Sequence, residues 1–144
     1  MDKKKDLVIK LRTSGLRPTK QRVKLAEFLF NREKTFHFTV ENLDKAINSN
    51  RKNSDDKIAL ATIYNTVHAF KKAGHLKEIL VREGKNYFDT NTTSHHHFYD
   101  ELNNQLTDIE KNKIELKKIP TPPKGKSIKN INVIINIDND NQNH

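Results

Sequence analysis

The fold is decided by residues 60–74, which read LATIYNTVHAFKKAG. Ile63, Val67 and Phe70 recur at intervals of three and four residues, so they form one apolar face of an expected helix. Gly74 stands where that helix should end, because glycine readily adopts the left-handed backbone of a helix C-terminus. The stretch therefore predicts an amphipathic helix whose other side is polar.

Shorter helices and one hairpin are expected around this helix. Apolar residues at helical spacing follow Thr19 and Thr39, and threonine is a good helix N-cap. A loop that holds Phe36-His37-Phe38 is expected between these two helices. Residues 79–82 and 86–89 flank Glu83-Gly84-Lys85, which is typical of a β-hairpin. Three helices, a fourth that would read DNA and a hairpin wing predict a winged helix-turn-helix.

The chain beyond this hairpin predicts a smaller unit made mainly of strands. Residues 97–101 and 105–109 indicate a second hairpin. Residues 111–118 indicate a weak helix, which the prolines after it would end. Residues 129–137 alternate apolar and polar side chains, with Ile134 as an exception, and predict a strand. We expect its apolar face to pair with a second copy of the chain across a two-fold axis.

Charge divides the chain in the same way. Residues 1–85 hold 20 lysines and arginines against 10 acidic residues, whereas residues 86–144 hold 7 against 8. The net charge of +9 therefore comes from the first part, which favours a polyanionic partner. The expected fold class is α+β: an N-terminal winged helix-turn-helix DNA-binding domain over residues 1–89, a C-terminal α/β dimerisation domain over residues 90–138, and a disordered tail over residues 139–144.

Composition limits the chemistry that the chain can carry. Its 144 residues include no cysteine, so disulfides, thiolate zinc sites and cysteine nucleophiles are excluded. A bound metal must then be held by nitrogen and oxygen atoms. No apolar run approaches the ~18 residues of a membrane span. The lysine-rich N-terminus leads into no apolar signal block, so we expect a cytoplasmic protein with no membrane partner.

The polar face of the helix over residues 60–74 is a candidate DNA-reading surface. Asparagine can pair with adenine, an aromatic ring can pack on a thymine methyl, and lysine can meet phosphate. A merely solvated helix face is the alternative, which the hairpin and the positive charge disfavour. RNA binding is disfavoured because the sequence has neither an aromatic-rich sheet motif nor a GXXG loop. The expected DNA-binding residues are Arg17, Lys20, Arg22, Ala61, Thr62, Tyr64, Asn65, His68 and Lys72.

Three consecutive histidines form a second candidate site. On a strand, His95 and His97 share one face and His96 points to the other. Asp89 ends the wing, and Asp108 lies on the strand expected to pair with His97. Imidazoles and carboxylates together suit a borderline divalent ion such as Fe(II), Mn(II) or Zn(II). A solvated or structural role is the alternative, and for a histidine triplet taken alone it is the commoner one.

Several runs of residues carry a family resemblance. They are Leu16-Arg17-Pro18-Thr19-Lys20-Gln21-Arg22, Leu60-Ala61-Thr62-Ile63-Tyr64-Asn65-Thr66, the Ala73-Gly74 stop, and the spacing from Phe88-Asp89 to His95-His96-His97. In these runs the chain resembles the ferric uptake regulator (Fur) family, over essentially residues 5–137. The runs at 64–68 (YNTVH), 95–99 (HHHFY) and 119–125 (IPTPPKG) are most similar to its Irr branch, the iron response regulators.

The resemblance implies a metal site and a function. The family's regulatory metal ligands fall on His37, Asp89, His95, His97 and Asp108. A homodimeric repressor is implied, which binds an inverted repeat on double-stranded DNA and controls iron- and haem-responsive genes. Its signal would be a divalent metal (Fe, Mn or Zn) or haem. A manganese-, ferrous-iron- or peroxide-sensing repressor of the same family is the alternative.

Two functions from other classes are less favoured. Five protein ligands leave a metal little open coordination, and no further base or nucleophile is evident, so we do not expect an enzyme. A structural protein that packages nucleic acid would need neither the localised charge nor the histidine and carboxylate constellation.

Two departures from the family's pattern affect the cofactors. Many members carry a CxxC pair for structural zinc, but this chain has Asp100 and Asn103 at those positions, so no structural cysteine–zinc site is expected. Some Irr-type regulators carry a Cys-Pro haem motif, which a chain without cysteine lacks. Haem would therefore have to bind through His95, His96 and His97.

Overall fold

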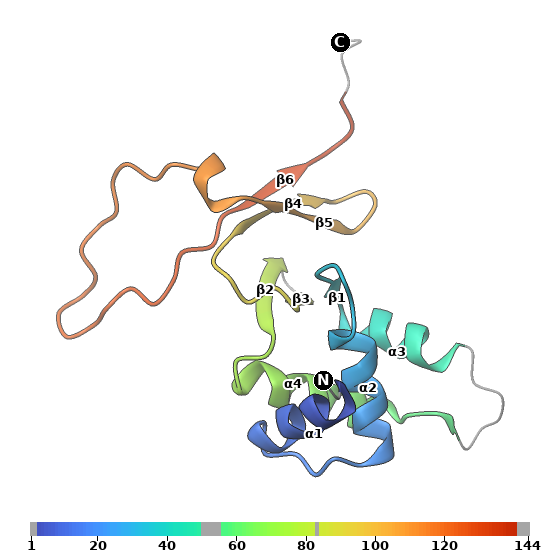
Figure 1. The fold of residues 1–144 in the computed structure, drawn as a ribbon. Coiled ribbons are helices and arrows are strands. Elements are labelled where there is room, and N and C mark those ends of the chain that lie inside the picture. Colours follow the sequence, from blue (N-terminus) through green and yellow to red (C-terminus); the bar gives the residue numbers. More distant parts are fainter. Residues whose placement is uncertain (1–2, 50–55, 83, 141–144) are drawn as a thin grey trace. The chain divides into compact units, whose positions relative to one another are not determined.

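The computed structural model describes residues 3–49, 56–82 and 84–140 (Figure 1). The chain divides into two compact units, unit 1 over residues 1–92 and unit 2 over residues 93–144. The division of function between residues 1–89 and 90–138 stays a prediction. Residues 141–144 of the expected tail lie outside the described residues. No helix among the described residues is long and apolar enough to cross a membrane.

Unit 1 has the elements of a winged helix. In chain order they are α1 (Lys3–Thr13), α2 (Lys20–Phe30), β1 (His37–Phe38), α3 (Val40–Asn48), α4 (Leu60–Lys72), β2 (Lys77–Arg82) and β3 (Lys85–Asp89). Both expected N-caps are confirmed: the Thr19 hydroxyl accepts from the Arg22 N–H at 3.3 Å, and the Thr39 hydroxyl accepts from the Asn42 N–H at 3.0 Å. These bonds satisfy backbone donors that the first turn of a helix leaves without an intrahelical partner.

The apolar face of α4 lies at the centre of the core of unit 1. Ile63, Val67 and Phe70 are fully buried, as their spacing predicted. The Phe70 ring meets the Phe30 ring of α2 edge-on at 5.2 Å between centroids. Beyond Lys72 the backbone of Gly74 takes a φ of +87°, and its N–H bonds to the Lys71 carbonyl at 3.0 Å. The helix therefore ends as the sequence predicted.

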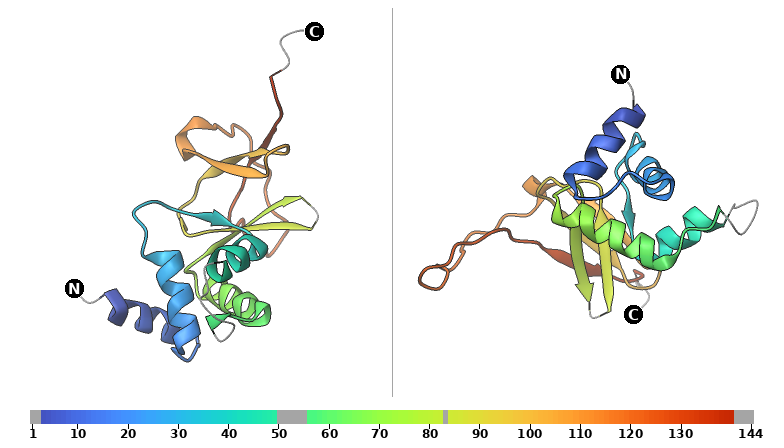
Figure 2. Two further views of the ribbon diagram at one scale, coloured as in Figure 1. Left: turned by 90° about the vertical axis from the view of Figure 1, so that its right-hand side faces the viewer. Right: turned by 90° about the horizontal axis from the view of Figure 1, so that it is seen from below.

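A three-stranded antiparallel sheet of order β1-β3-β2 completes unit 1. Figure 2 shows the β2–β3 hairpin projecting beyond the helices of this unit. The loop expected at residues 36–38 is partly wrong, because His37 and Phe38 form the two-residue strand β1. Strand β1 pairs with β3, so that His37 lies opposite Asp89 and Phe38 opposite Phe88. Its pairing partner is distant in sequence, so no local pattern could indicate this strand.

Unit 2 contains a second three-stranded sheet. Its elements are β4 (His96–Asp100), β5 (Gln105–Ile109), the 3₁₀ turn η2 (Lys111–Lys113) and β6 (Ile134–Ile137), and the strand order is β5-β4-β6. Strands β4 and β5 form the expected hairpin, and His97 lies opposite Asp108. Between η2 and β6 the chain makes a long excursion from this sheet without regular structure (Figure 1).

Two expectations for unit 2 are wrong. The helix over residues 111–118 is only the turn η2, because the segment has just two apolar residues, two positions apart, and so no apolar helical face to bury. The strand over residues 129–137 is limited to residues 134–137. It runs parallel to β4 within the same chain, with His97 opposite Ile134. The pairing of its apolar face across a two-fold axis stays a prediction. Because β4 begins at His96, residues before Val133 extend past the end of their partner strand.

Candidate metal centre and DNA-reading face

Unit 1 brings together two of the five expected metal ligands. The pairing of β1 with β3 places His37 Nε2 3.0 Å from Asp89 Oδ2. The Asp89 side chain is fully buried, whereas that of His37 is 18% exposed. The Asn91 N–H donates to Asp89 Oδ1 at 2.8 Å, which fixes the carboxylate. Burying a carboxylate costs free energy unless a positive charge pairs with it, so this geometry suits a protonated His37 or a bound cation.

Unit 2 brings together the other three expected metal ligands, His95, His97 and Asp108. Asp108 Oδ1 lies 3.1 Å from His95 Nε2 and 3.2 Å from His97 Nε2, and the two imidazole centroids are 4.4 Å apart. His95 and His97 share a face because side chains alternate along a strand, and the β4–β5 register supplies Asp108 from the neighbouring strand. Both imidazoles are buried.

The hydrogen-bond geometry of His95 is compatible with a metal ion at this trio. His95 Nδ1 lies 2.7 Å from the Thr93 carbonyl oxygen, which can only accept a hydrogen bond. Nδ1 therefore carries the proton, and in the neutral imidazole Nε2 presents a lone pair towards the Asp108 carboxylate. Two acceptors at 3.1 Å need a proton or a cation between them. Nitrogen and oxygen donors of this kind suit Fe(II), Mn(II) or Zn(II).

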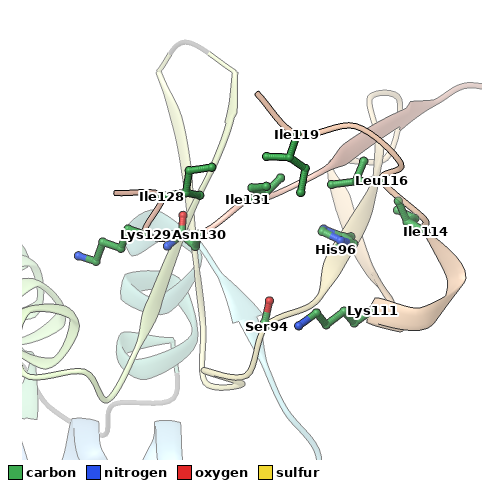
Figure 3. Close-up of a pocket in the computed structure, with 10 residues that line it drawn as sticks. All are labelled: Ser94, His96, Lys111, Ile114, Leu116, Ile119, Ile128, Lys129, Asn130 and Ile131. Atoms are coloured by element: carbon green, nitrogen blue, oxygen red, sulfur yellow. The ribbon is translucent and has the colours of Figure 1, made fainter. Parts of the chain in front are cut away.

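His96 lies on the opposite face of β4 from His95 and His97. Its Nδ1 accepts from the Val133 N–H at 3.0 Å. Figure 3 shows its imidazole among the side chains that line a cavity of about 470 Å³ within unit 2. The three histidines grouped as a haem site are thus not brought together. The cavity was not expected, because its apolar residues follow no period along the chain; they are Ile114, Leu116, Ile119, Ile128 and Ile131.

The two positions that replace the family's CxxC pair have a role of their own. Asp100 Oδ2 accepts from the Asn103 side-chain amide at 2.8 Å, and Asp100 Oδ1 accepts from the backbone N–H groups of Leu102 and Asn103. The side-chain and backbone hydrogen bonds from Asn103, with that from Leu102, lower the pKa of the Asp100 carboxyl. This hydrogen-bonded turn joins β4 to β5 without a thiolate ligand.

The polar side of α4 carries the expected DNA-reading residues. Tyr64 is 53% exposed, Ala61, Asn65 and Lys72 are exposed, and Thr62 and His68 are half-buried. Arg17 and Lys20 are exposed near the start of α2, and the half-buried Arg22 guanidinium donates to the Arg17 carbonyl at 3.2 Å. Side chains that can contact bases and side chains that can contact phosphates are thus accessible in unit 1.

Comparisons with known proteins agree on one family. The chain matches the model of the ferric uptake regulator family over residues 13–136. The peroxide-responsive repressor PerR of Staphylococcus aureus (strain Mu50 / ATCC 700699) is 30% identical over 103 residues, which are 72% of this chain. The chain spans 66% of the length of that relative.

Solved structures share the fold. The ferric uptake regulator from Pseudomonas aeruginosa with manganese has a TM-score of 0.65 at 20% identity and covers 94% of this chain and 98% of its own. The ferric uptake regulator from Francisella tularensis with iron has a TM-score of 0.67 at 17% identity, and the coverage is 86% and 92%. Since the family model matches most of the sequence, the chain belongs to the ferric uptake regulator family, whose members are transcriptional regulators and not enzymes.

Proposed function

We propose that the chain is a metal-responsive, homodimeric transcriptional regulator that reads double-stranded DNA with α4. Two groups of metal-binding side chains carry this proposal: His37–Asp89 in unit 1 and His95–His97–Asp108 in unit 2. A short connection joins the first group to the second. Only residues 90–94 separate Asp89 from His95. An extended chain of that length spans at most ~20 Å, which is short enough to permit both groups to supply ligands to one ion.

A single ion held by all five ligands would act as a switch. Its donors would be His37, Asp89, His95, His97 and Asp108. Two of them belong to the DNA-reading unit and three to the other unit, so occupancy would restrict how the units turn against each other. In a dimer this restriction would set the angle between the two copies of unit 1, which are the reading heads of the dimer. A metal that favours the angle needed for DNA binding would change DNA affinity, and the size of this change is the coupling free energy between the two sites.

The reading face is tested by comparing two kinds of substitution. The probes are a duplex that the wild-type protein selects from a random pool and a scrambled duplex of equal composition. We expect Tyr64→Ala or Asn65→Ala to lower the ratio of the two affinities, at a cost of ~1–3 kcal/mol for a lost base contact. Arg17→Ala should weaken both complexes alike, because phosphate contacts carry no sequence information. Fluorescence anisotropy measures both affinities, and a Tyr64→Ala protein with unchanged selectivity contradicts the assignment.

Dimerisation and the place of action belong to the same proposal. Two reading heads are needed to bind an inverted repeat, so we infer a homodimer formed through unit 2. We infer that a regulator of this family acts in the cytoplasm. Sedimentation that finds only monomer at micromolar concentration would contradict the dimer.

The effector is proposed to be iron, with manganese or zinc as other ions that the donor set accepts. Control of iron- and haem-responsive genes, and the closer resemblance to Irr-type regulators, stay predictions. The name of the Staphylococcus aureus relative supports peroxide sensing as the alternative. Adding peroxide to the protein loaded with Fe(II), which can reduce peroxide, tests this alternative, since a peroxide sensor should then lose DNA binding. The Mn(II)-loaded protein is the control, because Mn(II) does not react with peroxide in this way.

Haem is a second candidate effector, and the surroundings of His96 favour it. The cavity has an apolar wall for a macrocycle, and Lys111 and Lys129 for carboxylates. Its imidazole, of His96, is 5% exposed and could ligate the iron only if the hydrogen bond from the Val133 N–H to Nδ1 opens, because Nε2 otherwise carries the ring proton. We expect His96→Ala to remove the Soret shift that follows addition of haem, whereas His95→Ala and His97→Ala should keep it. If His96→Ala binds haem as the wild type does, haem does not use this cavity.

A further inference from the structure

An aromatic contact on the reading face involves Tyr64 and His68 of α4. Their ring centroids are 4.2 Å apart, and the ring planes are inclined by 38°. The two residues are four positions apart in one helix, so their side chains are neighbours on its surface. A tyrosine alone on a solvated helix face can take more than one rotamer. Contact with the imidazole of His68 therefore restricts the orientation of the Tyr64 ring.

His68 is itself held by the core of unit 1. Its ring lies edge-on to that of Phe88 in β3, at 5.5 Å between centroids and 83° between planes. Phe88 is 2% exposed and stacks on Phe38 of β1 at 5.8 Å. Buried rings of this kind are closely packed and cannot shift without disturbing their neighbours. A continuous row of rings thus connects the rigid sheet to the exposed Tyr64.

A hollow beside these rings offers the Tyr64 side chain an alternative orientation. It measures about 230 Å³ and is lined by Tyr64 and His68 of α4, by Val40 and Glu41 of α3, and by Gly84, Asn86 and Phe88 of the hairpin. If the ring of His68 is removed, the hollow grows next to Tyr64. The phenol can then turn towards Phe88 and away from the exposed side of α4.

We propose that His68 is a positioning residue, whose ring holds Tyr64 in the orientation that reads base edges. The imidazole acts as an aromatic surface in this role, and its nitrogen atoms are not needed for DNA selectivity. This inference rests on the proposed function, because it takes α4 as the reading helix. It changes the role of His68 from a polar DNA contact to a support for Tyr64.

Three substitutions of His68 in the full chain separate the two roles. His68→Phe keeps a ring without polar nitrogens, His68→Gln keeps polar atoms without a ring, and His68→Ala keeps neither. The measured quantity is the ratio of affinities for the selected and the scrambled duplex. We expect His68→Phe to match the wild type, and His68→Gln and His68→Ala to lower the ratio by about 2- to 12-fold, the factor that corresponds to loss of one aromatic pair. The reverse order, with glutamine active and phenylalanine defective, overturns the proposal.

A double-mutant cycle tests whether His68 acts through Tyr64. In a Tyr64→Ala protein, the further change His68→Ala should leave the affinity ratio unchanged, because there is no ring left to position. Losses that multiply would show an independent DNA contact and overturn the proposal. Without DNA, the ring-current shift of the Tyr64 ring protons should be lost in His68→Gln and retained in His68→Phe.

The outcomes also distinguish this inference from the proposed function. If Tyr64→Ala leaves selectivity intact, α4 is not the reading helix and both ideas fail. If Tyr64→Ala lowers selectivity but neither His68→Gln nor His68→Ala does, only the positioning role fails. Far-UV circular dichroism and the melting temperature of each variant show whether a loss comes from unfolding.

Discussion

Replacing His95 and His97 together by alanine should abolish the response of DNA binding to manganese. Both Nε2 atoms lie within 3.2 Å of Asp108 Oδ1, so the change removes two of the three donors that unit 2 supplies. Loss of an outer hydrogen-bond partner of a metal ligand already costs ~10–100-fold in metal affinity. We expect the loss of two ligands to exceed that range, as measured by isothermal titration of the purified protein with Mn²⁺.

His96→Ala is the matched control for this experiment. It removes the intervening imidazole on the same strand, but that side chain lies on the opposite face of β4, so manganese affinity should stay near that of the wild type. His37→Ala gives a third, distinct result. The remaining four ligands should still bind manganese, more weakly, while DNA affinity ceases to depend on it. Unchanged manganese affinity in the His95 and His97 double variant would place the metal elsewhere.

Phe70→Ala should strongly destabilise unit 1. The ring is fully buried at the centre of the α4 face and packs edge-on against Phe30, so its removal leaves a cavity that neighbouring elements cannot fill. Such substitutions cost ~3–5 kcal/mol. All α-helices of the described residues lie in unit 1, so urea unfolding followed by circular dichroism at 222 nm reports on this unit.

Leu60→Ala is the matched control on the same helix. Leu60 is 52% exposed in the first turn of α4, and its truncation should change the free energy of unfolding by less than ~0.5 kcal/mol. If the two alanine variants unfold at the same urea concentration, the packing described for Phe70 is incorrect.

Local sequence was sufficient wherever the decisive interactions span few residues. The caps at Thr19 and Thr39, the end of α4 at Gly74 and the β4–β5 hairpin all depend on contacts between near neighbours in the chain. The register of that hairpin follows from its short turn, so the approach of Asp108 to His97 could be expected from the residues alone. Alternation along β4 likewise separates His96 from the two histidines beside it.

Only the tertiary structure decided the features that join distant segments. The pairing of His37 with Asp89 requires the two-residue strand β1 to pair with β3, although α3 and α4 lie between these strands in the sequence. Two residues are too few to show a periodic pattern. The parallel pairing of β6 with β4 and the cavity beside His96 depend in the same way on a long excursion returning to the sheet. Closing such loops costs entropy, which is recovered only when many groups pack at once. The outcome is therefore set by the whole packed unit, and no short stretch of residues contains it.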